Sequence, residues 1–129
     1  MTTVFYLSKI EDLLNQVSQQ IFIFNLEAQR LENTIDLLVK SIKDREELLV
    51  FLRQGDVNVS VSEYAEIKKE IEFAKQKIKE NEATIQQTKQ MIKEAKKTYD
   101  KYLKDYNEAA EKLDGSNVIR TDKWNKSKN

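Results

Sequence analysis

Apolar residues recur at alternating spacings of three and four along two stretches of this chain, residues 7–52 and 64–113. The first stretch holds Leu7, Ile10, Leu14, Val17, Ile21, Phe24, Ala28, Leu31, Ile35, Leu38, Ile42, Leu49 and Leu52. The second holds Tyr64, Ile67, Ile71, Ala74, Ile78, Ile85, Ile92, Ala95, Tyr99, Tyr102, Tyr106, Ala109 and Leu113. Only Arg45 interrupts the first set, and only Asn81 and Thr88 interrupt the second. A strict seven-residue repeat keeps one apolar seam facing a partner helix, so the pattern predicts two long coiled-coil helices.

Polar and glycine-containing segments mark the expected ends of these helices. We predict one helix over about residues 3–53, a loop over 54–62 and a second helix over about 62–113. Gly55 suits the left-handed residue that closes a helix, and Ser62 followed by Glu63 suits an N-cap with an acid in the first turn. If Ser60 is the N-cap instead, Glu63 completes a capping box.

Folding the chain back at the loop predicts an all-α fold, an antiparallel coiled-coil helical hairpin over residues 1–113. Facing seam residues then have numbers that sum to about 116, so that Leu14 meets Tyr102 and Leu38 meets Ile78. The alternative is one continuous helix that associates in parallel with copies of itself, but Gly55 and the loss of the repeat after Leu52 disfavour it.

Polar residues agree with this register. Asn81 and Thr88 fall within the seam, where buried polar groups fix register and oligomeric state at some cost in stability. Arg45 is expected to reach out of the seam with its stem over Ile71. The oppositely charged neighbours expected across the hairpin are Glu32 with Lys89, and Glu46 with Lys68 and Lys75.

Composition narrows the possible chemistry. The 129 residues suffice for one domain, 34% of them are charged, the formal net charge is zero, and there is no His and no Cys. Without those side chains, and without a glycine-rich phosphate loop, we expect no enzyme, no catalytic residues, no metal and no cofactor. No apolar run is long enough to span a membrane, and no signal peptide is expected at the start of the sequence. We expect a cytoplasmic protein, or a virion protein if the source is viral.

Apolar residues outside the seam are the strongest candidates for function. Phe22, Ile23 and Leu26 point away from the expected partner helix, and exposed apolar clusters usually mark protein-binding surfaces. They could serve self-association, a different protein partner, or no partner at all. Other off-seam residues of this kind are Leu37, Val39, Leu48, Val50 and Phe51.

Residues 114–129 depart from the repeat and form an expected C-terminal docking tail. Its large apolar residues are Val118, Ile119 and Trp124, set among polar and basic residues. Because Trp is enriched at binding hot spots, we expect Trp124 to dock onto a neighbouring subunit or back onto a helix.

Two further features have plainer explanations. The lysines between Lys89 and Lys104 could meet phosphates, but acidic residues interleave them and indicate a solvated helix face, so nucleic acid is not an expected partner. The tyrosines Tyr99, Tyr102 and Tyr106 could stack on bases, but their seam spacing indicates packing with the hydroxyls at the edge.

The expected architecture resembles that of prefoldin-type chaperone subunits, secretion-machine stalk proteins and viral scaffolding proteins. The string Leu-Asp-Gly-Ser-Asn-Val at 113–118 is similar to a turn in some prefoldin subunits, but it follows the second helix, so we assign no family. We expect a non-enzymatic structural or assembly subunit of a larger complex, with a phage or viral particle as one setting. The alternatives are an adaptor or chaperone-like protein that binds a client, and a nucleic-acid-associated protein that uses the lysines of the second helix.

Overall fold

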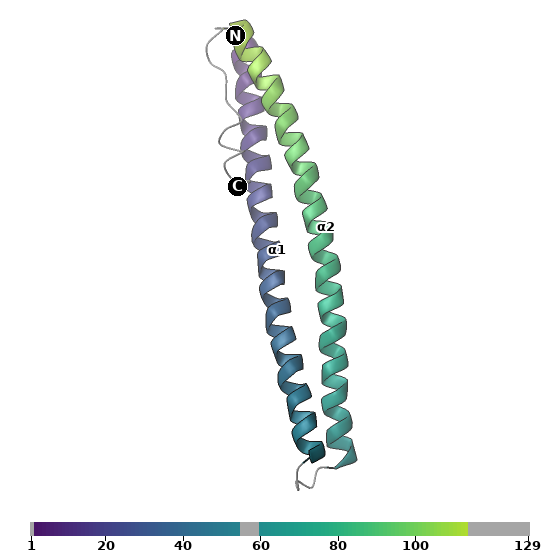
Figure 1. Cartoon of the computed structure of the whole chain (residues 1–129). Helices are drawn as coiled ribbons and strands as arrows, with labels where there is room; N and C mark the ends of the chain where they lie inside the picture. The colour runs from purple at the N-terminus through teal and green to yellow at the C-terminus, as the bar shows by residue number, and fades with distance from the viewer. Residues whose placement is uncertain (1, 55–59, 114–129) are drawn as a thin grey trace. The chain divides into compact units, whose positions relative to one another are not determined.

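Two long helices make up the described part of the chain (Figure 1). The computed structural model describes residues 2–54 and 60–113, with the side chains of residues 2 and 113 left aside. Helix α1 spans Thr2–Gln54 and helix α2 spans Val61–Leu113, 53 residues each. The helices pack against each other and the described residues contain no strand, which confirms the all-α helical hairpin.

Helix α2 begins one residue earlier than the main prediction. The Oγ of Ser60 accepts a hydrogen bond from the backbone N–H of Glu63 at 3.2 Å, and the Tyr64 N–H donates to the Ser60 carbonyl at 3.1 Å. Ser60 is therefore the N-cap, and the assignment of Ser62 to that role is wrong because Ser62 already lies within the helix. The predicted helix end at Gly55 lies outside the described residues.

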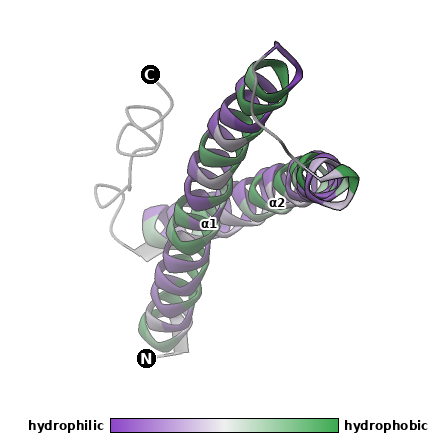
Figure 2. Ribbon diagram, turned by 90° about the horizontal axis from the view of Figure 1, so that it is seen from below, coloured by the Kyte–Doolittle hydropathy of each residue, from purple (hydrophilic) through white to green (hydrophobic). Residues whose placement is uncertain are grey.

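The helices contribute to two compact units, which are treated one at a time. The central unit comprises residues 26–89, of which 55–59 are not described, and the terminal unit comprises the described residues 2–25 and 90–113. Hydrophobic positions recur between hydrophilic ones along both helices (Figure 2). Every predicted seam position with a described side chain is buried or half-buried, as the heptad pattern requires.

The core of the central unit follows the predicted antiparallel register. Ile42 and Leu49 of α1 are buried together with Ile71 and Ala74 of α2. Four half-buried residues pack against this cluster, namely Leu38, Tyr64, Ile67 and Ile78. Asn81 and Thr88 lie within the seam with only 9% and 5% of their surfaces exposed, which confirms that the central unit buries two polar groups.

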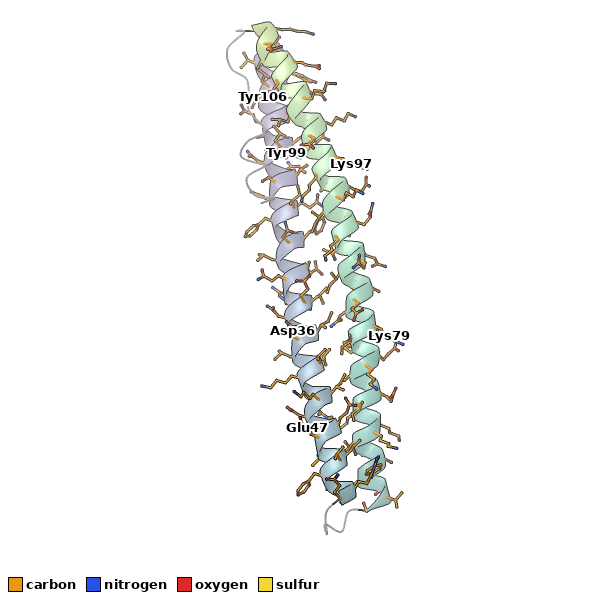
Figure 3. The ribbon with its side chains drawn as sticks, in the orientation of Figure 1. Asp36, Glu47, Lys79, Lys97, Tyr99 and Tyr106 are labelled. Carbon is orange, nitrogen blue, oxygen red and sulfur yellow. The ribbon has the colours of Figure 1, made fainter. Side chains whose placement is uncertain are left out.

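The core of the terminal unit joins the start of α1 to the end of α2. Ile10, Leu14 and Leu103 form a buried cluster, and Tyr99, Tyr102 and Tyr106 pack against it. Tyr99 and Tyr106 lie on the side of α2 that faces α1, whereas Lys97 points away from it (Figure 3). The tyrosines are thus seam residues with accessible edges, which is the plainer of their two explanations.

The seam on α2 is displaced by one residue near its end. Leu103 and Ala110 are the most buried side chains there, each 2% exposed, whereas Tyr102 and Ala109 of the predicted seam are only half-buried. An α-helix with 3.6 residues per turn drifts by about 20° per heptad relative to a strict seven-residue repeat. Such drift brings the following residue toward the partner helix, so the seam prediction is incomplete in this segment.

Candidate functional site

Apolar side chains outside the seam are concentrated on one helix. Of the fourteen large apolar side chains exposed in the described residues, eleven belong to α1 and three to α2. On α1 they are Val4, Phe5, Tyr6, Phe22, Ile23, Leu26, Leu37, Val39, Leu48, Val50 and Phe51. On α2 they are Val61, Phe73 and Met91. The seam already occupies the facing sides of both helices, so these side chains remain available to other molecules.

The predicted binding residues of α1 fall in different units. Phe22 and Ile23 belong to the terminal unit and are 63% and 58% exposed, while Leu26 belongs to the central unit and is 47% exposed. Their exposure agrees with the sequence pattern, which places them away from the seam.

Shallow grooves open on the described residues of the terminal unit, and two of them are lined by both helices. The first, here called the tyrosine groove, has a volume of about 440 Å³ and is lined by Leu13, Gln16, Val17, Gln19, Gln20, Ile23 and Tyr102. The second, here called the end groove, has a volume of about 510 Å³ and is lined by Thr3, Tyr6, Asp105, Glu108, Ala109 and Lys112. The tyrosine groove is apolar with an amide rim, and the end groove carries two carboxylates, so the two could bind different groups.

The central unit has one groove crossed by an ion pair, here called the ion-pair groove. Its volume is about 410 Å³, and its lining residues are Leu38, Ser41, Arg45, Glu66, Lys69, Glu70, Phe73 and Ala74. The Arg45 Nε donates to the Glu70 Oε2 at 2.8 Å, and its Nη1 also bonds the Ser41 hydroxyl. Arg45 leaves the seam as predicted, but it meets a carboxylate of α2 that the sequence did not single out.

One exposed apolar residue lines the ion-pair groove, and two more share a helix face with its lining residues. Phe73 on α2 is 72% exposed and forms part of its wall. On α1, Leu37 lies four positions before Ser41, and Leu48 lies three positions after Arg45. Both spacings place side chains on the same helix face. The groove could therefore accept a further apolar helix or loop along its length.

Two tyrosine hydroxyls make charged hydrogen bonds between the helices. In the central unit the Arg53 Nη2 donates to the Tyr64 hydroxyl at 2.6 Å, which lowers the pKa of Tyr64 and raises that of Arg53. In the terminal unit the Tyr106 hydroxyl donates to the Glu11 Oε1 at 2.7 Å, which raises the pKa of Tyr106. Each contact joins α1 to α2 within one unit.

Four lysines in the described part of α2 form ion pairs with glutamates. Lys75, Lys77 and Lys97 each lie 3.8–3.9 Å from a glutamate three positions away on the same helix. Lys89 lies 3.9 Å from Glu32 of α1, which confirms that predicted neighbour. Among the described residues the expected pairing of Glu46 with Lys68 or Lys75 does not form an ion pair. The local balance of charge gives little support to a surface for nucleic-acid phosphates.

The described residues were also compared with the requirements of a metal site and of a membrane-spanning helix. Residues 2–54 and 60–113 contain no cluster of three or more acidic, His or Cys side chains suited to a metal ion. Within the same residues, neither helix has an apolar stretch long enough to cross a bilayer. The predicted tail residues Val118, Ile119 and Trp124 lie outside the described residues. Comparison of the chain with family models, with curated proteins and with solved structures finds no match.

Proposed function

We propose that this chain is a non-enzymatic structural or assembly subunit that joins protein partners through the exposed apolar residues of α1. The proposed contact residues include Phe22, Ile23 and Leu26, together with Leu48 and Phe51. The proposed setting is a larger complex, such as a phage or viral particle, in which several copies of the hairpin meet.

The observation that carries this proposal is the unequal distribution of exposed apolar side chains between the two helices. Eleven of the fourteen exposed large apolar side chains lie on α1, whereas the outer face of α2 is rich in charged residues. Scattered neutral exposure would have distributed such residues over both helices. A one-sided concentration instead favours a bundle in which α1 faces other subunits and α2 faces solvent.

The two alternatives differ in what they would bind. A client-binding adaptor would use the same apolar residues, but it would hold proteins that are not subunits of its own assembly. A nucleic-acid-associated protein would use the lysines of α2 between Lys89 and Lys104, of which Lys97 lies 3.8 Å from Glu94 and Lys89 lies 3.9 Å from Glu32. Association that survives high salt would favour the apolar surface, because phosphate binding weakens steeply with salt.

The mass of the full chain in solution tests the proposal. We expect sedimentation equilibrium to give a multiple of the 15.2 kDa chain mass. Leu48→Ser with Phe51→Ser should weaken association, because burying one such side chain contributes about 1.5–3 kcal/mol. Leu48 and Phe51 are already partly buried in the single hairpin. We therefore expect the double substitution to weaken the free energy of association by about 3 kcal/mol, which raises the dissociation constant roughly a hundredfold.

A matched substitution on α2 distinguishes a surface effect from a loss of fold. Lys79→Ser changes an exposed side chain that points away from α1 (Figure 3), and it should leave the mass unchanged. Circular dichroism should show the same helical content in all variants. A wild-type chain that stays monomeric at every concentration, and whose double variant still enters its native complex normally, would refute the proposal.

A further inference from the structure

Five exposed residues of α1 in the central unit lie along one line of the helix, here called the leucine stripe. They are Leu26, Arg30, Leu37, Asp44 and Leu48. An α-helix turns about 100° per residue, so their directions around the α1 axis fall within about 40° of one another. The three leucines are 47%, 69% and 43% exposed in chain order. None of the five occupies a seam position, so the whole stripe is available to another molecule.

The leucine stripe is symmetric about Leu37. Leu26 precedes Leu37 by 11 positions, and Leu48 follows it by 11. Arg30 precedes it by seven positions, and Asp44 follows it by seven. A symmetric dimer sets the same surface of each copy against the other, so that each contact occurs twice. When two stripes run antiparallel about a two-fold axis at Leu37, Leu26 of each copy faces Leu48 of the other. Arg30 of each copy then faces Asp44 of the other.

Charge favours this arrangement over a parallel one. Among the described residues, neither Arg30 nor Asp44 takes part in an ion pair within the hairpin. In a parallel dimer in register, each of them would face its own counterpart, and like charges repel. The antiparallel dimer instead sets each against an opposite charge, and complementary charges fix the orientation of helical partners. The stripe is therefore complementary to itself in the antiparallel direction.

We propose that the leucine stripe is the interface of a symmetric antiparallel dimer, in which α1 of one hairpin packs against α1 of a second copy with Leu37 at the two-fold axis. This inference rests on the proposed function and names a second copy of the chain as the partner of this surface. The stripe uses no seam residue, so each hairpin keeps its own core in the dimer.

An exchange of the two charges tests the pairing. Arg30→Asp sets a carboxylate against Asp44 of the second copy, and Asp44→Arg sets a guanidinium against Arg30. Each single change removes two ion pairs from the dimer and creates two repulsions. In sedimentation equilibrium at low salt, we expect each to raise the dissociation constant about tenfold. The double variant restores opposite charges and should dissociate like the unmodified chain.

Recovery in the double variant can come only from contacts between copies. The two exchanged positions lie 14 residues apart on α1, which is about 21 Å along the helix axis, so the substitutions cannot compensate within one chain. Both side chains are exposed, and circular dichroism should show the same helical content in all variants.

A cross-link tests the position of the axis. The chain has no cysteine, so Leu37→Cys carries the only thiol, and a short bismaleimide should join two copies through it. Lys43→Cys is the control, because Lys43 is exposed but points about 120° away from Leu37 around the α1 axis. In the proposed dimer the two copies of position 43 are also about 18 Å apart along the axis, so they should not be joined.

Two results would overturn the antiparallel dimer and leave the proposed function standing. One is a double variant that dissociates as readily as the single variants, and the other is equal cross-linking from positions 37 and 43. In either case, an oligomer that Leu48→Ser with Phe51→Ser still weakens would use α1 in another arrangement. A chain that stays monomeric at every concentration also overturns the dimer. Entry of the Leu48→Ser, Phe51→Ser variant into the native complex then tests the proposed function separately.

Discussion

Truncation of Leu103 tests the displaced seam of the terminal unit. Leu103 is 2% exposed and packs with Ile10 and Leu14, so Leu103→Ala removes about three buried carbon atoms and leaves a cavity. At about 0.8 kcal/mol per buried methylene, the lost transfer energy is about 2.4 kcal/mol, and the cavity adds to it. Neighbouring side chains near a helix end can relax inward, which limits that addition. We expect a loss of about 3 kcal/mol in the free energy of unfolding.

Chemical denaturation followed by circular dichroism measures this loss as a lower midpoint at unchanged slope. Leu37→Ala is the matched control, because it deletes the same three carbon atoms from a side chain that is 69% exposed to solvent. The control should change stability by less than about 0.5 kcal/mol in dilute solution. A loss below about 1 kcal/mol for Leu103→Ala would show that Leu103 does not lie in the seam, and the displacement would then be wrong.

Three other predictions concern polar groups. Because hydrogen bonding lowers the pKa of Tyr64 and raises that of Tyr106, phenolate absorbance should show Tyr64 titrating first. The hydrogen bond from neutral Tyr106 should stabilise the fold below the unfolded pKa of about 10, and this stabilisation should be lost as the pH rises through the folded pKa. Tyr64→Phe and Tyr106→Phe each remove one of the two transitions and so assign them, and a Tyr106 that titrates before Tyr64 would contradict the prediction. Asn81→Ile should raise the unfolding free energy by about 1–3 kcal/mol, as it replaces a buried amide in an apolar seam, and a lower value would show that the amide is satisfied. A double-mutant cycle on Arg45 and Glu70 should give only about 0.2–1 kcal/mol, because both side chains are partly exposed, and a larger coupling would mean that the pair is shielded from water.

The heptad pattern was enough to predict the helices, their antiparallel pairing and the burial of Asn81 and Thr88. It could not predict that Leu103 replaces Tyr102 as the central seam residue, because that depends on how far each helix follows a 3.5-residue period. The capping serine was also ambiguous, since Ser60 and Ser62 both precede acids. Local sequence alone does not decide which of two such serines has its hydroxyl in reach of a free N–H.

The candidate surface was predictable for α1 and much less so for α2. Consecutive apolar residues such as Phe22 and Ile23 cannot all face one seam, so their exposure follows from the sequence. Phe73 is the one large exposed apolar residue in the described part of α2 between Val61 and Met91, and its place beside Arg45 and Glu70 depends on the side of the hairpin to which it belongs. The grooves likewise arise from residues of both helices and have no signature in either helix alone.

The antiparallel pairing means that the two units form at different times while the chain is synthesised. The contact between Arg53 and Tyr64 joins residues 11 positions apart, whereas the contact between Glu11 and Tyr106 joins residues 95 positions apart. Closing the longer loop first would cost about 2 kcal/mol more in chain entropy, so we expect pairing to start in the central unit and proceed toward the termini. On a ribosome Glu11 is made 95 residues before its partner Tyr106. The first apolar residues of α1 therefore stay uncovered until the last turns of α2 have been made, and during that time chaperones or neighbouring nascent chains can bind them.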